Sequence, residues 1–266
     1  MSSIVRPTPP QITRRLLVLA AAVFAVVIAY AQMAMEWGQT PAEFAADSDA
    51  TLRVAGYAFS IWGLIYLGLL VYAVRQALPQ TGESRLIHRL GWPSLAALLG
   101  IGWWIVASAF DWEWATIVLI FGSLLALLVP LLMEASTIRS LDRADRDRWT
   151  VAWPLAALAG WLTVASPVNL LTVLTGNGDL PSSPSPEVWA LLAVAVVAAV
   201  GLGVTARLRT LAYPLPVAWG LLGVFVAELE RGREAVAYGA LAASVAVVVG
   251  AVILSFRLRR GVERAT

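Results

Sequence analysis

The chain has 266 residues, a mean hydropathy of +0.77, 59% hydrophobic residues and only 14% charged residues. So little polar surface cannot cover a water-facing globule, which excludes a soluble domain and predicts a membrane protein. The chain has no cysteine, which excludes disulfides, thiolate metal sites and cysteine nucleophiles.

Eight apolar stretches without a formal charge are each long enough to cross about 30 Å of hydrocarbon, which takes roughly 20 residues of helix. They are residues 16–35, 54–74, 90–110, 114–133, 149–174, 188–206, 210–227 and 235–256. Transmembrane β-strands would alternate apolar and polar residues, whereas these stretches are apolar on all sides. The sequence therefore predicts an all-α, polytopic membrane protein with about eight transmembrane helices.

The arginines predict the orientation of these helices. The chain has nineteen arginines and no lysine. With eight spans, sixteen arginines fall on one side, and only Arg53, Arg231 and Arg233 fall on the other. The positive-inside rule then places both termini in the cytoplasm. This distribution also explains the net charge of +2. Because no basic segment outside the spans is interleaved with aromatic residues, we expect no nucleic-acid partner.

A segment rich in proline and serine, residues 181–186, divides the chain by composition. Five aromatic-rich spans precede it, and three spans of mostly Ala, Val, Leu and Gly follow. We predict a five-helix membrane bundle in residues 1–175, a loop in residues 176–187, and three additional helices with a basic tail in residues 188–266.

Two aromatic stripes are the most specific signals in the sequence. Phe59, Trp62 and Tyr66 are spaced i, i+3 and i+7, so they project from one face of the second span. Such a stripe is compatible with plain helix packing or with the wall of a ligand pocket.

The fifth span carries the second stripe. Trp161, Ala165 and Asn169 are spaced i, i+4 and i+8 along one helical face. An amide within the membrane needs hydrogen-bond partners, so Asn169 should face the bundle or a wet cavity. It could link helices or supply a polar contact to a ligand.

At these residues the chain resembles the translocator protein family, also called the tryptophan-rich sensory proteins (TspO/MBR) or peripheral benzodiazepine receptors. Residues 59–66 resemble the family's F-x-x-W-x-x-x-Y signature, and residues 161–169 are similar to its W-x-x-x-A-x-x-x-N pattern. Trp103 falls where the family has an N-x-x-W element, whose asparagine is absent here. The resemblance covers about residues 16–175, and family members commonly stop after five helices.

The resemblance implies an aromatic pocket, within the first five helices, for a flat hydrophobic molecule such as a tetrapyrrole, a sterol or an isoprenoid. A sensor or transporter of this kind requires no cofactor, and its partners are the lipid bilayer and the small molecule, with a homodimer as a possible assembly. The expected location is the bacterial inner membrane. The expected ligand-binding residues are Phe59, Trp62, Tyr66, Trp103, Trp161, Ala165 and Asn169.

The alternative is an enzyme, a membrane-embedded isoprenoid (terpene) cyclase in which tryptophans stabilise a carbocation. Such an enzyme needs an acid to start the reaction. Asp111, Glu113 and Glu134 are the candidates, and all three stand at predicted helix ends, where a solvated surface role is also open. The one histidine, His88, lies in a predicted loop between arginines. We assign no catalytic residue and no metal ligand.

Overall fold

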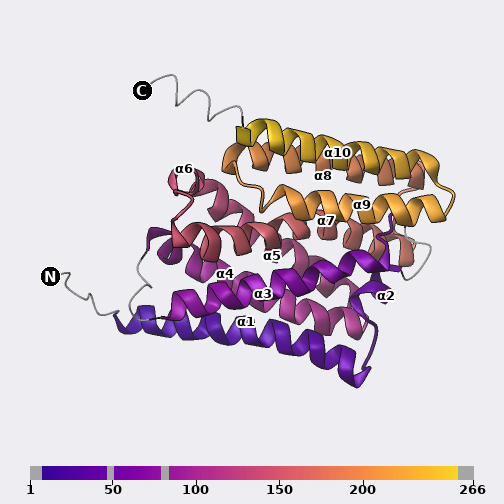
Figure 1. The fold of residues 1–266 in the computed structure, drawn as a ribbon. Coiled ribbons are helices and arrows are strands. Elements are labelled where there is room, and N and C mark those ends of the chain that lie inside the picture. Colours follow the sequence, from indigo (N-terminus) through magenta and orange to yellow (C-terminus); the bar gives the residue numbers. More distant parts are fainter. Residues whose placement is uncertain (1–7, 47–50, 79–83, 257–266) are drawn as a thin grey trace.

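The computed structural model describes residues 8–46, 51–78 and 84–256, and within these ranges the regular elements are all helical (Figure 1). Four of them are short: α2 (Pro41–Ala46), the 3₁₀ turn η1 (Gly56–Ser60), α6 (Ala135–Ser140) and the π-helical turn η2 (Arg148–Ala152). The long helices run side by side along one bundle. They are α1 (Pro9–Met35), α3 (Ile61–Ala77), α4 (Arg85–Ala109), α5 (Glu113–Met133), α7 (Trp153–Gly176), α8 (Pro186–Leu208), α9 (Pro214–Glu230) and α10 (Glu234–Phe256).

Seven helical segments in the described part of the chain are long and apolar enough to cross a membrane. The remaining long helix, α9, corresponds to the predicted span at residues 210–227. It has 17 residues, about 26 Å at 1.5 Å per residue, which is the lower limit for a span. It packs against α7 and α10 along the bundle. The predicted all-α, polytopic membrane architecture is confirmed.

Helix α7, the fifth long helix, contacts α3 and α5 among the helices before it and α8 and α9 among those after it. It is apolar all round, as expected for a helix buried on every side, and 72% of its membrane-spanning window is buried. Glycine allows its close contact with α9, because a Cβ on Gly160 would lie 2.2 Å from the backbone oxygen of Tyr213. Beside this contact, the hydroxyls of Tyr213 and Thr163 form a hydrogen bond of 2.7 Å.

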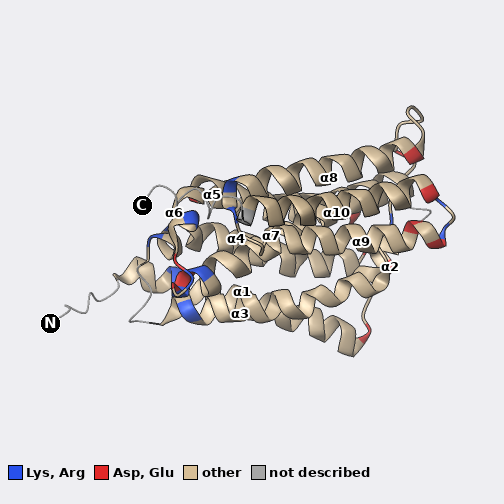
Figure 2. Ribbon diagram, turned by 45° about the horizontal axis from the view of Figure 1, so that its top comes forward, with Lys and Arg blue, Asp and Glu red and all other residues tan. Residues whose placement is uncertain are grey.

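The two ends of the bundle carry opposite charges (Figure 2). The arginine-rich end holds α6, the start of α1 and the end of α8, and most carboxylates gather at the other, acidic end. At the arginine-rich end Arg75 pairs with Asp147 at 2.8 Å, and Arg85 pairs with Glu134 at 3.0 Å. The grouping agrees with the one expected from eight spans.

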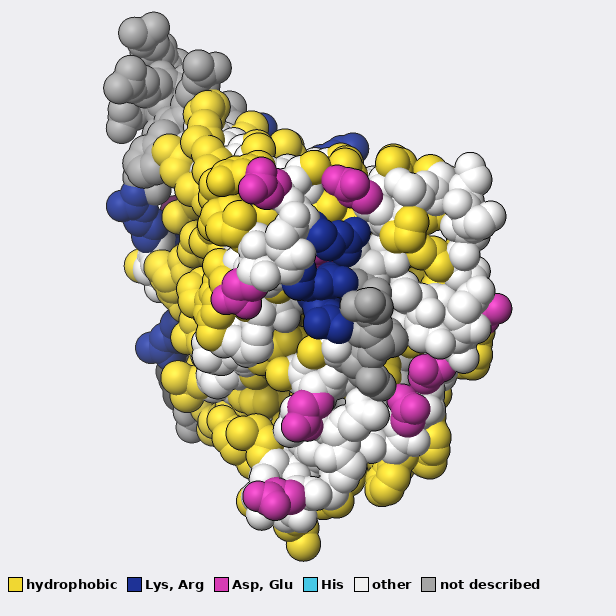
Figure 3. Space-filling view, turned by 90° about the vertical axis from the view of Figure 1, so that its right-hand side faces the viewer, with side chains coloured by type: hydrophobic (Ala, Val, Ile, Leu, Met, Phe, Trp, Pro, Cys, Tyr) yellow, Lys and Arg dark blue, Asp and Glu magenta, His cyan; other side chains and the backbone are white. Residues whose placement is uncertain are grey.

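The three arginines at the acidic end converge on one buried carboxylate. Glu228, in the last turn of α9, is 0% exposed. Arg231 Nη1 lies 2.9 Å from its Oε1, and Arg233 Nη1 lies 3.1 Å from its Oε2. The backbone N–H of Arg53 donates to Oε1 at 2.7 Å. In Figure 3 the arginines fill the middle of this face, with acidic side chains around them. The buried carboxylate gives these arginines a structural role.

Candidate functional site

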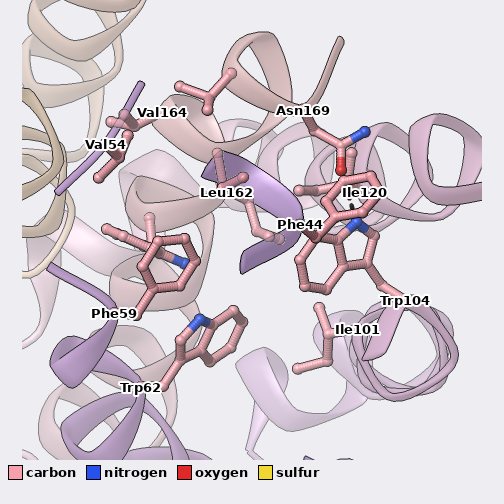
Figure 4. A pocket seen from close by; sticks show the side chains of 14 residues that line it. Phe44, Val54, Phe59, Trp62, Ile101, Trp104, Ile120, Leu162, Val164 and Asn169 are labelled. Atoms are coloured by element: carbon pink, nitrogen blue, oxygen red, sulfur yellow. Dashed lines mark hydrogen bonds between the residues drawn. The ribbon is translucent and has the colours of Figure 1, made fainter. Parts of the chain in front are cut away.

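An apolar cavity of about 40 Å³ lies within the half of the bundle nearer the acidic end. The helices α2, α3, α4, α5 and α7 surround it, together with the segment that leads into α3. Figure 4 shows Phe59 and Trp62 on one side, and Phe44 and Trp104 on the other. The lining residues are Phe44, Ala45, Val54, Phe59, Trp62, Ile101, Trp104, Ile120, Trp161, Leu162, Val164, Ala165, Val168 and Asn169.

Phe59 and Trp62 of the first predicted stripe meet Trp161 of the second at this cavity. The rings of Phe59 and Trp161 pack edge to face, with centroids 5.9 Å apart and planes at 80°. Trp62 approaches Trp161 in the same way, at 6.3 Å and 79°. This geometry is favourable because the positive ring edge meets the negative face of its partner. The second and fifth predicted spans thus share one aromatic wall, to which Ala165 adds a small side chain.

Asn169 lies at the opposite edge of the cavity and links three helices. Trp104 Nε1 on α4 donates to Asn169 Oδ1 at 2.9 Å, and Asn169 Nδ2 donates to Thr116 Oγ1 on α5 at 2.9 Å. The amide is buried, so these bonds provide the partners that it needs away from water. The link between helices is therefore present. An amide has two N–H groups and two acceptor sites, and one of each remains for a further contact.

A second hollow, which we call the vestibule, adjoins the cavity. It is partly open, has a volume of about 330 Å³ and lies among α1, α2 and the start of α3. Phe59 and Trp62 line both spaces, so their rings form the partition between them. Tyr66 lines the vestibule, where it stacks on Trp62 with centroids 5.0 Å apart.

Trp103 does not line either space. Its side chain is half exposed on the outside of the bundle, 5.7 Å from the ring of Phe24. Successive residues of a helix point about 100° apart, so only one of two adjacent tryptophans can face inward. Trp104 takes the inward place, and the expectation that Trp103 forms part of the pocket is corrected. Phe44, which no sequence motif indicated, also lines the cavity, where α2 brings its ring against Trp104 with centroids 5.9 Å apart.

The three carboxylic acids that are candidates for a cyclase line neither the cavity nor the vestibule. The side chain of Glu113 accepts a hydrogen bond from Asn177. Glu134 stands at the arginine-rich end, where the Thr137 hydroxyl and then the Arg85 guanidinium hold the pKa of its carboxyl below the usual value. Asp111 occupies a turn with φ of 58°. The described residues that line the cavity include no carboxylic acid.

Helix α9 is hydrogen-bonded to the segment before α3, in which Val54 and Phe59 form part of the cavity wall. The backbone N–H of Ala55 donates to the oxygen of Gly223 at 3.0 Å, and Trp219 Nε1 donates to the oxygen of Ala58 at 2.9 Å. A Cβ on Gly223 would lie 2.8 Å from Val54, which lines the cavity. Helix α9, one of the three helices after residue 185, therefore takes part in positioning the site.

A family model described as "TSPO-like protein" matches residues 14–253. The match continues beyond residue 175, where the resemblance carried by the sequence motifs ends, and reaches through α8 and α9 into α10. No curated protein and no solved structure matches the chain.

Proposed function

Because the chain belongs to the TSPO-like protein family, we propose that it binds a flat hydrophobic molecule of the tetrapyrrole class, as a sensor or a transporter. The observation that carries this proposal is the meeting of Phe59, Trp62 and Trp161 at one cavity. Flat apolar ligands bury their faces against such rings, and each aromatic contact adds about 0.5–1.5 kcal/mol beyond the area buried.

The volumes indicate how such a ligand would be accommodated. The cavity alone, at about 40 Å³, has room for only a few water molecules, since a cavity needs about 10–15 Å³ to hold each one. The vestibule, at about 330 Å³, is at the lower end of the range for small-molecule sites, about 300–1,000 Å³. We propose that the ligand lies in the vestibule and displaces the partition of Phe59 and Trp62, so that its leading edge reaches Trp161.

Titration of the purified protein tests this proposal. Protoporphyrin IX should quench the tryptophan fluorescence along a saturable curve with a stoichiometry near one, because several indoles line the site. A sterol and a carotenoid, titrated in parallel, show which flat apolar class is preferred. Denatured protein in the same detergent provides the control for absorption of light by the porphyrin. Quenching that never saturates, or that the denatured protein reproduces, would exclude a specific site.

We also propose that the arginine-rich end faces the cytoplasm of a bacterial inner membrane. The positive-inside rule supports this orientation, and the three arginines at the other end are held around Glu228. Reporter fusions should place the loop at Arg143 in the cytoplasm and the loop at Asp179 outside it. The reverse result, or both loops on one side, would contradict the orientation.

A further inference from the structure

A groove with apolar walls runs between α5 and α8 near the arginine-rich end, apart from the cavity and the vestibule. Its volume is about 600 Å³. Val129 of α5, 50% exposed, forms part of one wall, and Val200 of α8 forms part of the other. On α8, a Cβ added to Gly203 would meet no atom within 4 Å, so the groove is empty at that point. Both walls belong to membrane-spanning helices, so the groove faces hydrocarbon.

The groove ends at a cluster of positive charge. Arg207, in the last turn of α8, lines it and is exposed. Arg139 of α6 is held at the same place, because its Nη1 donates to the backbone oxygen of Arg207 at 2.6 Å. Two of the carboxylates at this end are engaged with other arginines: Asp147 with Arg75, and Glu134 with Arg85. Within the described ranges no carboxylate pairs with Arg207.

We propose that this groove is a binding site for an anionic phospholipid, with one acyl chain between α5 and α8 and the phosphate at Arg207. Each part of the site matches one part of that ligand. An apolar groove among membrane helices suits an alkyl chain, and basic pockets between such helices bind anionic head groups. A zwitterionic lipid fits less well, because its ammonium group would stand beside Arg139 and Arg207. The site is independent of the proposed tetrapyrrole pocket.

The charge requirement is tested with the whole protein reconstituted in vesicles of phosphatidylcholine and phosphatidylglycerol at several mole ratios. After extraction in a mild detergent, lipid that remains bound is measured by mass spectrometry. The parent should retain phosphatidylglycerol in preference to phosphatidylcholine. Arg207→Gln should weaken this retention about fivefold, the value of one arginine near a lipid surface. Arg143→Gln, the same charge change at the same end outside the groove, should leave it unchanged.

The groove itself is tested by filling it. Gly203→Leu keeps every charge and places a side chain in space that is open, so the bound phosphatidylglycerol should be lost while the circular dichroism spectrum stays the same. Val129→Trp fills the groove from the other wall if Gly203→Leu does not purify. Equal retention of the two lipids by the parent would overturn the proposal. So would equal losses in Arg207→Gln and Arg143→Gln, or full retention after the groove is filled.

Discussion

Glu228→Gln is expected to lower the free energy of unfolding by about 3 kcal/mol. Removing one partner of a buried ion pair typically costs about 3–5 kcal/mol, because the remaining charge is left without compensation. Here Glu228 is fully buried, whereas Arg231 and Arg233 are 21% and 22% exposed, so water can compensate part of the loss. The lower end of the range therefore applies. Denaturant unfolding in a mild detergent, followed by circular dichroism, measures the change.

Glu230→Gln is the matched control, since it removes the same charge from the same helix two residues later. Glu230 is exposed, and exposed substitutions usually stay within about 0.5 kcal/mol of the parent. If both variants unfold like the parent protein, the arginine cluster at the acidic end contributes nothing measurable to stability. A large and equal loss in both would indicate a general effect of charge on this face.

Trp161→Ala is expected to weaken porphyrin binding by about 1–3 kcal/mol, or roughly five- to more than a hundredfold in Kd. Trp161 supplies the ring that Phe59 and Trp62 both approach, so its loss removes the far wall of the proposed site. The side chain is only 2% exposed, and its removal also leaves a cavity that lowers stability. Trp161→Phe keeps part of the packing and should give an intermediate affinity by fluorescence titration.

Trp189→Phe separates a local effect from a general one. Trp189 lies on α8 outside the cavity, and its Nε1 donates to the oxygen of Pro181. The change should leave porphyrin affinity nearly unaltered. If Trp161→Ala stays folded and binds porphyrin as well as Trp189→Phe and the parent, then Trp161 is part of the packed core alone and the ligand site lies elsewhere.

The membrane-spanning helices could be predicted from sequence because hydrocarbon tolerates few charges. Arg85 and Glu113 at helix starts and Glu230 at a helix end mark the bounds within a few residues. Helical periodicity likewise placed Trp161 on the same face as Asn169, which was expected to point into the bundle, since the two are separated by two steps of four residues. That these residues bind a ligand stays a prediction.

A pattern in the sequence of α4 distinguishes Trp104, which faces inward, from Trp103, which faces outward. Ser108 lies four residues after Trp104 on the same face of α4, and both are buried. Leu99 lies four residues before Trp103, and both are exposed. Polar side chains in membrane helices point into the bundle, away from lipid. The serine therefore identifies the inward face, and with it the tryptophan that lines the cavity.

Other parts of the site depend on contacts between distant segments, which helical periodicity cannot reveal. Phe44 belongs to a helix of six residues in a connection that the hydropathy pattern leaves outside the membrane. Its burial at 3% exposure depends on where α4 and α7 end. In the same way, Arg53 is 175 positions from Glu228, and no local pattern links the two.

The hydrogen bond from Trp219 to Ala58 bears on the order in which the site forms during synthesis. The two residues are 161 positions apart, and translation at about 5–20 residues per second separates their emergence by roughly 10–30 s. Before Trp219 emerges, the nascent chain comes to hold both aromatic stripes, at residues 59–66 and 161–169, while the backbone that leads into α3 still has no indole donor. Maturation of the site therefore waits for insertion of α9, and a stalled chain that ends after α7 would keep one wall unfinished.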